Sequence, residues 1–241
     1  MTEVMDEMPV PGGFLRIRAC GEAATLVEVL TDDLEMSWRE VHGIAVIGDA
    51  PGFFGAVATY TSVLIEYDPV IHDFSEVVGM IRSRVAAGRS YEPKPGRRVI
   101  VPVVYGGKWG PDLEAVADEL ELSPDELVRR HHERPLLIRA VVSPAGSPMS
   151  EGPDLPAPVQ RQNSPRPSVL AGSVALAGRQ AITYATSSPG GWRLIGRTPV
   201  QLINPYHSPP VIYRPGDLVQ YLPIAADRWD EFLNVPVELR D

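Results

Sequence analysis

Apolar and polar positions follow strand-like patterns in the first part of the chain. Residues 14–19 alternate apolar with basic side chains, and residues 25–30 continue in the same way, so both segments are predicted strands. Residues 59–67 are rich in β-branched and aromatic side chains, which favours a third strand that ends at Asp68 and Pro69. The acidic stretch before position 14 is predicted to be a frayed tail.

Two helices are expected among these strands. Ser37 offers an N-cap with Glu40 three residues later, which is the capping-box pattern, and apolar residues follow on one face. The second helix is marked by apolar residues at helical spacing, namely Val77, Val78, Ile81 and Val85. Residues 49–55, between the first helix and the third strand, are predicted to be a loop. Together these elements predict a small α+β domain over residues 12–90.

Prolines and charges at residues 89–98 mark a boundary, and a second domain is predicted over residues 97–226. Residues 99–105 are typical of a buried strand. Two short helices follow, and the second opens with Ser123 as N-cap and Pro124 as its first residue.

Short strand-like runs separated by turns fill the last third of the chain, at residues 173–177, 181–185, 192–195, 200–203 and 218–224. Their length and spacing predict a closed β-barrel or a compact sandwich, and 25 prolines beside 21 glycines argue against a helical bundle. Eight of the prolines lie between Pro135 and Pro167, where no hydrophobic period is sustained. That stretch is therefore predicted to be a long loop or a partly disordered excursion.

The balance of charge limits the partners. The chain has 31 acidic and 22 basic residues and a net charge of -9, which argues against nucleic acid or an anionic membrane. No run of 18 or more apolar residues occurs, which argues against a membrane span, and the first residues lack the apolar core of a secretory signal. The single cysteine, Cys20, fits a reducing compartment, so we expect a cytoplasmic globular protein.

Several patterns that carry chemistry in other proteins are incomplete. The string G-x-S-x-G is missing, so turn chemistry outweighs a catalytic serine at Ser173 or in residues 187–191. The P-loop string is also missing. His131 and His132 are adjacent on a predicted helix and point about 100° apart, so they do not converge on a metal, and no metal is predicted. The two short helices resemble a helix-turn-helix but are too acidic for DNA.

Two glycine-rich strings remain as candidate sites. Residues 105–112 read Tyr-Gly-Gly-Lys-Trp-Gly-Pro-Asp, which is either an anion site at a helix N-terminus or a tight turn with a solvated lysine. Residues 190–199 combine paired glycines with Trp192 and Arg197, which are residue types enriched at ligand and protein contacts. The alternative for the second string is a barrel hairpin with Trp192 in the core.

The chain resembles a known family along nearly its whole length. The strings that carry the resemblance are YGGKWGPDLEAVADELELSPDELVRRH, SPRPSVLAGSVALAGRQAITYATSSPGGWRLIGRTPVQLINP and YRPGDLVQYLPI, with ACGEAATLVEVL and VATYTSVLIEYDP in the first half. They are similar to allophanate hydrolase subunit 1, also called the B-type subunit of 5-oxoprolinase, a family that includes bacterial sporulation-kinase inhibitors. The string SPGGW…GRTP is the most specific of them.

The resemblance implies an α+β fold, with a small N-terminal α/β-sandwich domain followed by a cyclophilin-like β-barrel domain. It also implies a heteromer with a homologous second subunit, which is allophanate hydrolase subunit 2 or the C-type subunit of 5-oxoprolinase, and with a third, A-type 5-oxoprolinase subunit. In such a complex, ATP bound by the assembled subunits drives the hydrolysis of an amide or a lactam, of the allophanate hydrolase or the 5-oxoprolinase type. For the latter type the reaction is the opening of 5-oxoproline to glutamate. The alternatives are a regulatory protein that inhibits a histidine kinase and a degenerate scaffold subunit.

The resemblance also points to a functional surface. The residues expected to line it are Tyr105, Gly107, Asp112, His131, Arg166, Ser173, Gly191, Trp192 and Arg197. Arg166 and Arg197 are expected to pair with a carboxylate or a phosphate, for which a planar guanidinium is suited. His131 is the catalytic candidate, because it is expected to titrate near neutral pH and to transfer a proton.

The chain departs from the family at two places. After His131 the family carries Gly-Phe-x-Pro-Gly-Phe-x-Tyr-Leu, whereas residues 141–149 here read Val-Val-Ser-Pro-Ala-Gly-Ser-Pro-Met. The first of two Pro-Arg pairs is Gln160-Arg161, while Pro165-Arg166 is kept. The first departure is expected to remove an aromatic wall of the ligand cleft.

Overall fold

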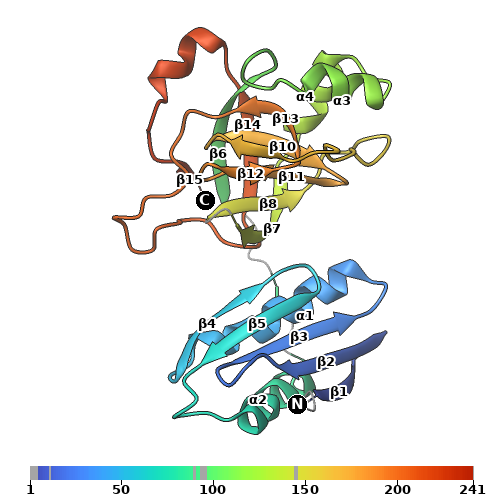
Figure 1. Ribbon diagram of the computed structural model, residues 1–241, viewed down its shortest axis with the longest axis vertical. Coiled ribbons are helices and arrows are strands. Elements are labelled where there is room, and N and C mark those ends of the chain that lie inside the picture. Colours follow the sequence, from blue (N-terminus) through green and yellow to red (C-terminus); the bar gives the residue numbers. More distant parts are fainter. Residues whose placement is uncertain (1–4, 11, 89–90, 93–96, 144–145, 241) are drawn as a thin grey trace. The chain divides into compact units, whose positions relative to one another are not determined.

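The chain divides into two compact units, Met1–Glu92 and Pro93–Asp241, and the division falls inside residues 89–98. The computed structural model describes residues 5–10, 12–88, 91–92, 97–143 and 146–240. A five-stranded antiparallel sheet organises the first unit in the order β1-β2-β3-β5-β4 (Figure 1). Its strands are β1 (Met5–Val10), β2 (Gly13–Ala19), β3 (Ala24–Leu30), β4 (Phe53–Ala58) and β5 (Ser62–Tyr67).

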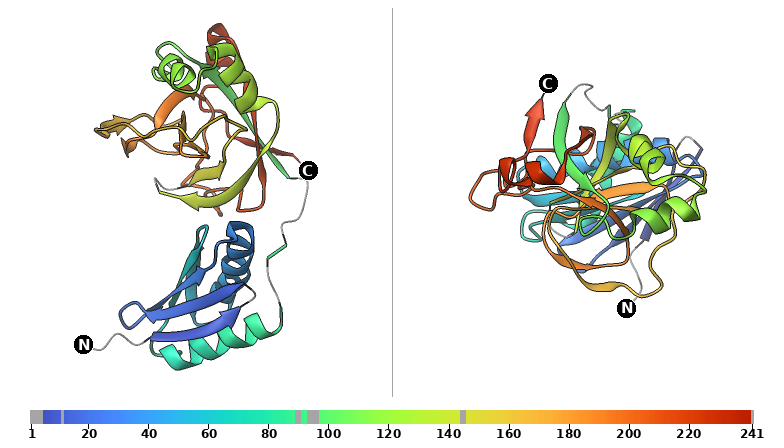
Figure 2. Two further views of the ribbon diagram at one scale, coloured as in Figure 1. Left: turned by 90° about the vertical axis from the view of Figure 1, so that its right-hand side faces the viewer. Right: turned by 90° about the horizontal axis from the view of Figure 1, so that it is seen from above.

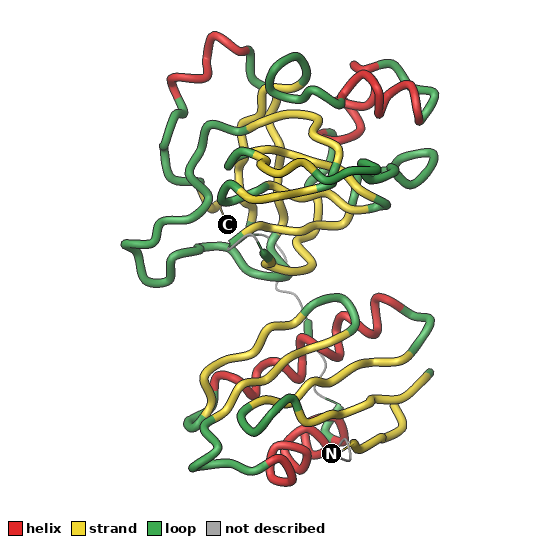
Figure 3. The backbone as a smooth tube through the Cα atoms, viewed as in Figure 1, coloured by secondary structure: helices red, strands yellow, loops and turns green. Residues whose placement is uncertain are grey.

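Helices cover one face of this sheet. They are α1 (Leu34–Ala45), which continues into the 3-10 helix η1 (Val46–Asp49), and α2 (Phe74–Ala86) (Figure 3). Side chains alternate between the two faces of a strand, so every second apolar residue meets the helices. Leu15, Ile17, Val27, Val63 and Ile65 are buried in this way and form one core with residues of α1 and α2.

Two segments of this unit that were predicted to be a tail and a loop form strands. Residues 5–10 form β1 instead of a frayed tail, because they pair with β2 along their length and Asp6 accepts hydrogen bonds from Arg82 of α2. Residues 53–58 form β4, which pairs with β5 and overlaps the predicted loop at 49–55. Glycine and proline in that segment obscured the strand pattern.

The start of the first helix also differs from the prediction. Asp33 is its N-cap, with the backbone N–H of Met36 donating to Asp33 Oδ1 at 2.9 Å. Ser37 therefore lies inside the helix and is buried. An aspartate in the β region before a helix satisfies an unpaired N–H as well as a serine does.

The second unit is a closed barrel of seven strands. They are β6 (Arg98–Tyr105), β7 (Leu136–Val142), β8 (Ser147–Glu151), β10 (Ser173–Ala177), β11 (Gln180–Thr183), β13 (Arg193–Arg197) and β14 (Leu218–Pro223). The order is β13-β10-β11-β8-β7-β14-β6, and β6 pairs back to β13 to close the ring. The α+β fold with a small sheet domain and a barrel is thus confirmed. Figure 2 shows the strands of this unit curving around a common interior.

Further elements sit around the barrel. Helices α3 (Leu113–Glu119) and α4 (Pro124–His132) follow β6, and Ser123 caps α4 as predicted. A ribbon is formed by β9 (Arg166–Val169) and β12 (Ser188–Gly190). The 3-10 helix η2 (Ala226–Glu231) begins at residue 226, where the predicted domain ends. Strand β15 (Glu238–Arg240) follows it and pairs with β6. Residues 200–203, predicted as a strand, contribute only one isolated bridge through Gln201.

The predicted excursion between Pro135 and Pro167 contains two strands in its first half, whereas residues 152–165 lie outside helices and strands, as predicted, apart from one bridge. Residues 136–142 and 147–151 form the antiparallel pair β7 and β8, and Val159 bridges to Gly178. Leu136, Ile138 and Ala140 are fully buried at every second position, which is a strand period that the surrounding prolines hid. Residues 144–145 lie outside the described part of the chain.

A chain of polar side chains crosses the barrel interior. The hydroxyl of Tyr105 on β6 lies 2.8 Å from Nδ1 of His131 on α4, and the His131 ring lies 4.4 Å from the Tyr221 ring. The Tyr221 hydroxyl in turn lies 3.0 Å from the Thr183 hydroxyl. One hydrogen bond to β6 and one ring contact with β14 thus hold helix α4, and a second hydrogen bond joins β14 to β11.

The environment of His131 contradicts the expectation that it titrates near neutral pH. The residue has no exposed surface, and burial, with a smaller contribution from His132, lowers its pKa to about 3. Its Nε2 makes no hydrogen bond among the described residues. The imidazole is therefore neutral at physiological pH, and its place is in the core.

The close approach between Gly110 and β13 can be tested by substitution. A Cβ at Gly110 would lie 2.0 Å from the carbonyl oxygen of Ile195, whereas a Cβ at Gly191 meets nothing nearer than 3.7 Å. We expect Gly110→Ala to lower the free energy of unfolding by about 3 kcal/mol, because backbone must move. Gly191→Ala is the matched control, with a change below about 1 kcal/mol. Urea unfolding of both variants measures this, and equal losses would contradict the packing described.

Burial of His131 makes stability depend on pH. The unfolded chain takes up a proton near pH 6.5 and the folded chain only near pH 3, so stability is complete above pH 6.5 and declines as pH falls below it. We expect a loss of about 2 kcal/mol from this residue between pH 7.5 and pH 5. His131→Gln should remove that part of the decline, while His207→Gln, at an exposed histidine, should keep it.

Denaturant unfolding at the two pH values measures the difference. Imidazole NMR signals of His131 in the folded protein provide a direct check, because they should not shift between pH 7.5 and pH 5. A His131 signal that titrates near pH 6.5 would show that the described burial is wrong.

Candidate functional site

The turn between β6 and α3 is the first glycine-rich candidate. Gly106 and Gly107 have φ of 70° and 52°, in the left-handed region that favours glycine, and Lys108 Nζ lies 4.7 Å from the centre of the Trp109 ring. The residue at the N-terminus of α3 is Asp112, whose carboxylate already places a negative charge there. Of the two alternatives, this arrangement supports the tight turn and disfavours an anion at this helix end.

The Asp112 carboxylate joins three separate segments. The backbone N–H of Leu194 on β13 donates to Oδ2 at 2.7 Å, and Arg166 Nη2 and Gln162 Nε2 donate to Oδ1 at 2.8 and 3.1 Å. The backbone N–H of Asp112 itself donates to the carbonyl of Leu194 at 2.9 Å. The Asp112 side chain is only 10% exposed, so these charge-assisted bonds hold a buried carboxylate.

Residues 160–166 lie along the second glycine-rich candidate. The N–H of Gln162 donates to the carbonyl of Gly191 at 2.8 Å, and Arg166 pairs with Gly190 in the β9–β12 ribbon. A Cβ at Gly190 would lie 2.3 Å from the hydroxyl oxygen of Tyr184, so a side chain at this position would have to displace that hydroxyl. The paired glycines therefore allow a close approach of Tyr184 from one side and of residues 160–166 from the other.

Trp192 lies at the edge of this arrangement. It is partly buried and packs against a small cluster formed by Val169, Ala175, Ile182, Tyr184 and Leu194. Val142 and Met149, from the segment that lacks the family's aromatic residues, pack against the same cluster. The guanidinium carbon of Arg161 lies 5.6 Å from the centre of the Trp192 ring, close enough for a cation–π contact.

Arg197 belongs to a different cluster. Its Nε donates to the carbonyl of Ala171 at 2.9 Å, and its guanidinium lies 5.4 Å from the Trp229 ring. Trp229 of η2 stacks on Trp109, with ring centres 3.9 Å apart and an angle of 21° between the planes. Lys108 and Arg197 thus lie against the two ends of a tryptophan pair, and burial lowers the pKa of Arg197.

The structure brings together only part of the predicted functional surface. Asp112, Arg166, Gly191 and Trp192 lie around residues 160–166, and we call these four residues with Arg161, Gln162 and Tyr184 the ribbon cluster. Tyr105 and His131 lie in the barrel interior, and Gly107 lies in the turn before α3. Ser173 is buried at the start of β10, where its backbone pairs with Arg197. That these residues bind a ligand stays a prediction.

Three members of the ribbon cluster were not predicted from the sequence. Arg161 and Gln162 lie in a stretch that was expected to be a loop, and Tyr184 lies at the end of a predicted strand. The sequence signal that could have found Arg161 was its place in the first of the two Pro-Arg positions of the family. Nothing in the sequence indicated that Tyr184 would meet Gly190.

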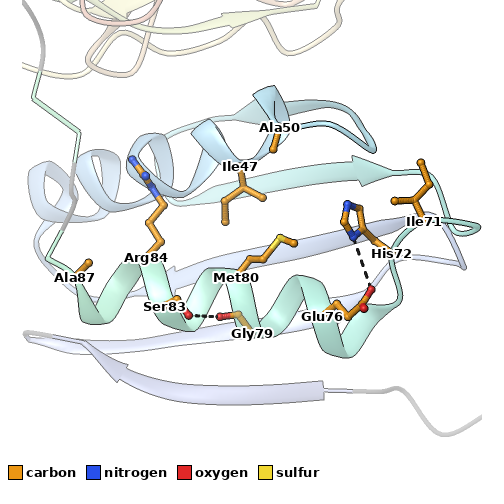
Figure 4. Close-up of a pocket in the computed structure, with 10 residues that line it drawn as sticks. All are labelled: Ile47, Ala50, Ile71, His72, Glu76, Gly79, Met80, Ser83, Arg84 and Ala87. Atoms are coloured by element: carbon orange, nitrogen blue, oxygen red, sulfur yellow. Dashed lines mark hydrogen bonds and ion pairs between the residues drawn. The ribbon is translucent and has the colours of Figure 1, made fainter.

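The first unit contains an open groove of about 890 Å³ between η1 and α2 (Figure 4). Its walls are apolar or small, and its polar side chains are engaged. His72 packs 4.8 Å from Phe53 and lies 3.7 Å from a carboxylate oxygen of Glu76, while Arg84 donates to the carbonyl of Gly43. The groove therefore has an apolar floor without a convergent polar group.

Two further observations concern metal ligands and membrane-spanning helices among the described residues. No group of three or more His, Cys, Asp or Glu side chains gathers as metal ligands would within the described ranges. None of the helices in the described part of the chain has the length and apolar character needed to cross a membrane.

Comparison with known proteins places the chain in a family. Residues 15–213 match the family model of the carboxyltransferase domain, subdomain C and D. The chain is 33% identical over 225 residues to the B-type subunit of 5-oxoprolinase from Bacillus subtilis (strain 168), covering 87% of this chain and 93% of that protein. Two further proteins of the same name, from Escherichia coli O157:H7 and Haemophilus influenzae, match at 37% and 29% identity.

Solved structures agree with this assignment. The crystal structure of TTHA0988 matches with a TM-score of 0.70 and 28% identity over 85% of this chain, which spans only 40% of that longer chain. Kluyveromyces lactis urea carboxylase matches in fold alone, with a TM-score of 0.75 at 16% identity over 98% of this chain and 25% of that one. The chain therefore belongs to the carboxyltransferase-domain family that includes the B-type subunits of 5-oxoprolinase.

Proposed function

We propose that this chain is one subunit of a heteromeric, ATP-dependent hydrolase that opens a cyclic amide, with 5-oxoproline as its substrate. The observation that carries the proposal is the match along 93% of a protein named as the B-type subunit of 5-oxoprolinase. A match over nearly the full length of that protein concerns both units of the fold, so it reaches beyond a shared barrel.

The ribbon cluster supports a binding role for this chain. Asp112 neutralises one charge of a group that also contains Arg161 and Arg166, so the surroundings of Trp192 keep a positive balance in a chain of net charge -9. A planar guanidinium and an aromatic face suit a small anionic ligand with a flat ring. In this proposal the cluster holds the substrate, and groups of the partner subunits supply the remainder of the chemistry.

Partner subunits and ATP complete the proposal. The partners are a homologous second subunit, the C-type subunit of 5-oxoprolinase, and a third subunit of the A type. ATP is held by the assembled complex and not by this chain alone, because this chain has no P-loop string. The complex works in the cytoplasm. The longer TTHA0988 chain, of which this chain spans 40%, supports the idea that this fold works together with additional polypeptide.

Co-expression with the two partner subunits tests the proposal. We expect the purified complex to hydrolyse ATP only when 5-oxoproline is present, and Arg166→Gln to lower kcat/KM at least tenfold by releasing residues 160–166 from Asp112. Arg82→Gln is the matched control, since Arg82 also pairs with an aspartate but lies in the first unit, and its kcat/KM should stay within twofold.

Size-exclusion chromatography of each complex separates a failure of assembly from a failure of catalysis. An intact complex of the three subunits that shows no turnover with 5-oxoproline would overturn the proposed function.

A further inference from the structure

The two arginines of the ribbon cluster have different surroundings. The Arg166 side chain is 29% exposed. Its Nη2 donates to Asp112 Oδ1 at 2.8 Å, so the charge of Arg166 is already paired. Arg161 is exposed and makes no ion pair or hydrogen bond among the described residues, and its guanidinium lies over Trp192. One arginine thus holds residues 160–166 in place, and the other has its donors available to a ligand.

A hydroxyl group on a buried side chain faces the same place. Tyr184 is only 3% exposed, and its hydroxyl makes no hydrogen bond within the part of the chain that the structure describes. The hydroxyl atom itself is not among the buried polar atoms that lack a partner, so it keeps some contact with solvent and can reach a group from outside the chain. Burial raises the pKa of Tyr184, and the charges of Arg161 and Arg166 oppose that rise, so both guanidinium groups lie within electrostatic range of the hydroxyl.

We propose that Arg161 and the Tyr184 hydroxyl together bind the carboxylate of a small ligand, with Trp192 as the adjacent wall and Arg166 as a positioning residue. The carboxylate accepts from the Arg161 guanidinium at the surface and from Tyr184 below it. The inference rests on the proposed function for the identity of the ligand, a carboxylate-bearing lactam, but not for the chemistry of the site.

Charge balance favours an anion over a neutral ligand here. Arg193 is near Glu119 at 3.9 Å, and Arg166 is paired with Asp112, which leaves the charge of Arg161 unopposed among the described residues. Tyr184 remains a neutral donor at physiological pH, since its pKa is raised. A carboxylate that accepts from both groups gains one charge-assisted bond and satisfies the hydroxyl.

Calorimetric titration of the full chain, without ATP or partner subunits, tests the inference. The probes are 5-oxo-L-prolinate, glutarate, inorganic phosphate and 2-pyrrolidinone, which is the same lactam without the carboxylate. We expect both carboxylates to bind and 2-pyrrolidinone to bind at least tenfold more weakly. Stronger binding of phosphate than of either carboxylate would overturn the assignment to carboxylates.

Variants assign the contacts. Arg161→Gln should weaken binding of 5-oxo-L-prolinate at least tenfold, Arg161→Lys should restore part of it, and Tyr184→Phe should weaken it about threefold to tenfold. Arg214→Gln, at another exposed arginine of the barrel unit, is the matched control and should bind as the parent chain does. Unchanged binding in Arg161→Gln, or no binding by the parent chain, would overturn the inference.

The two proposals fail separately. Carboxylate binding that depends on Arg161, together with an assembled complex that has no activity, would remove the hydrolase and keep the site. Turnover by a complex that carries Arg161→Gln with an unchanged KM would remove the site and keep the hydrolase.

Discussion

The buried carboxylate of Asp112 is the contact on which the arrangement of the ribbon cluster depends. It accepts from the backbone of β13, from Arg166 and from Gln162, and so ties together segments that are distant in sequence. Burying a carboxylate is costly unless each oxygen is satisfied, and the three donors achieve this. Without that charge, residues 160–166 would lose their anchor on the barrel, and the approach of Arg161 to Trp192 would lose its support.

The same arrangement explains why glycines and not catalytic side chains dominate the most specific motif. Gly190 admits the Tyr184 hydroxyl, and Gly191 receives a hydrogen bond from residues 160–166. These contacts are made by backbone, and any side chain at Gly190 would displace Tyr184. The motif thus encodes a close packing of three segments around Trp192, and the polar groups that can meet a ligand are supplied by neighbours that are distant in sequence.

The sequence predicted the larger features well where a single period was present, as in the strands that end at Tyr67 and Tyr105 and in the helix opened by Ser123. It failed where local signals competed, because Asp33 and Ser37 both offer a cap, and where prolines masked an alternating strand, as in residues 136–142. Only part of the site could be predicted, and the reason differs from the one for the helices and strands. Burial decides the chemistry of a histidine or an arginine, and burial depends on contacts between distant segments that no local pattern records.

Strand β6 is the first strand of the barrel to be synthesised, yet its hydrogen-bonded neighbours are β13, β14 and β15, near the other end of the unit. During translation, which proceeds from the N-terminus, the sheet of the first unit can form while β6 still lacks every one of these neighbours. The apolar side chains of β6 then stay uncovered until the late strands emerge from the ribosome. Such non-local pairing is slow to form, so this interval is when the nascent chain is most exposed to aggregation and most dependent on chaperones.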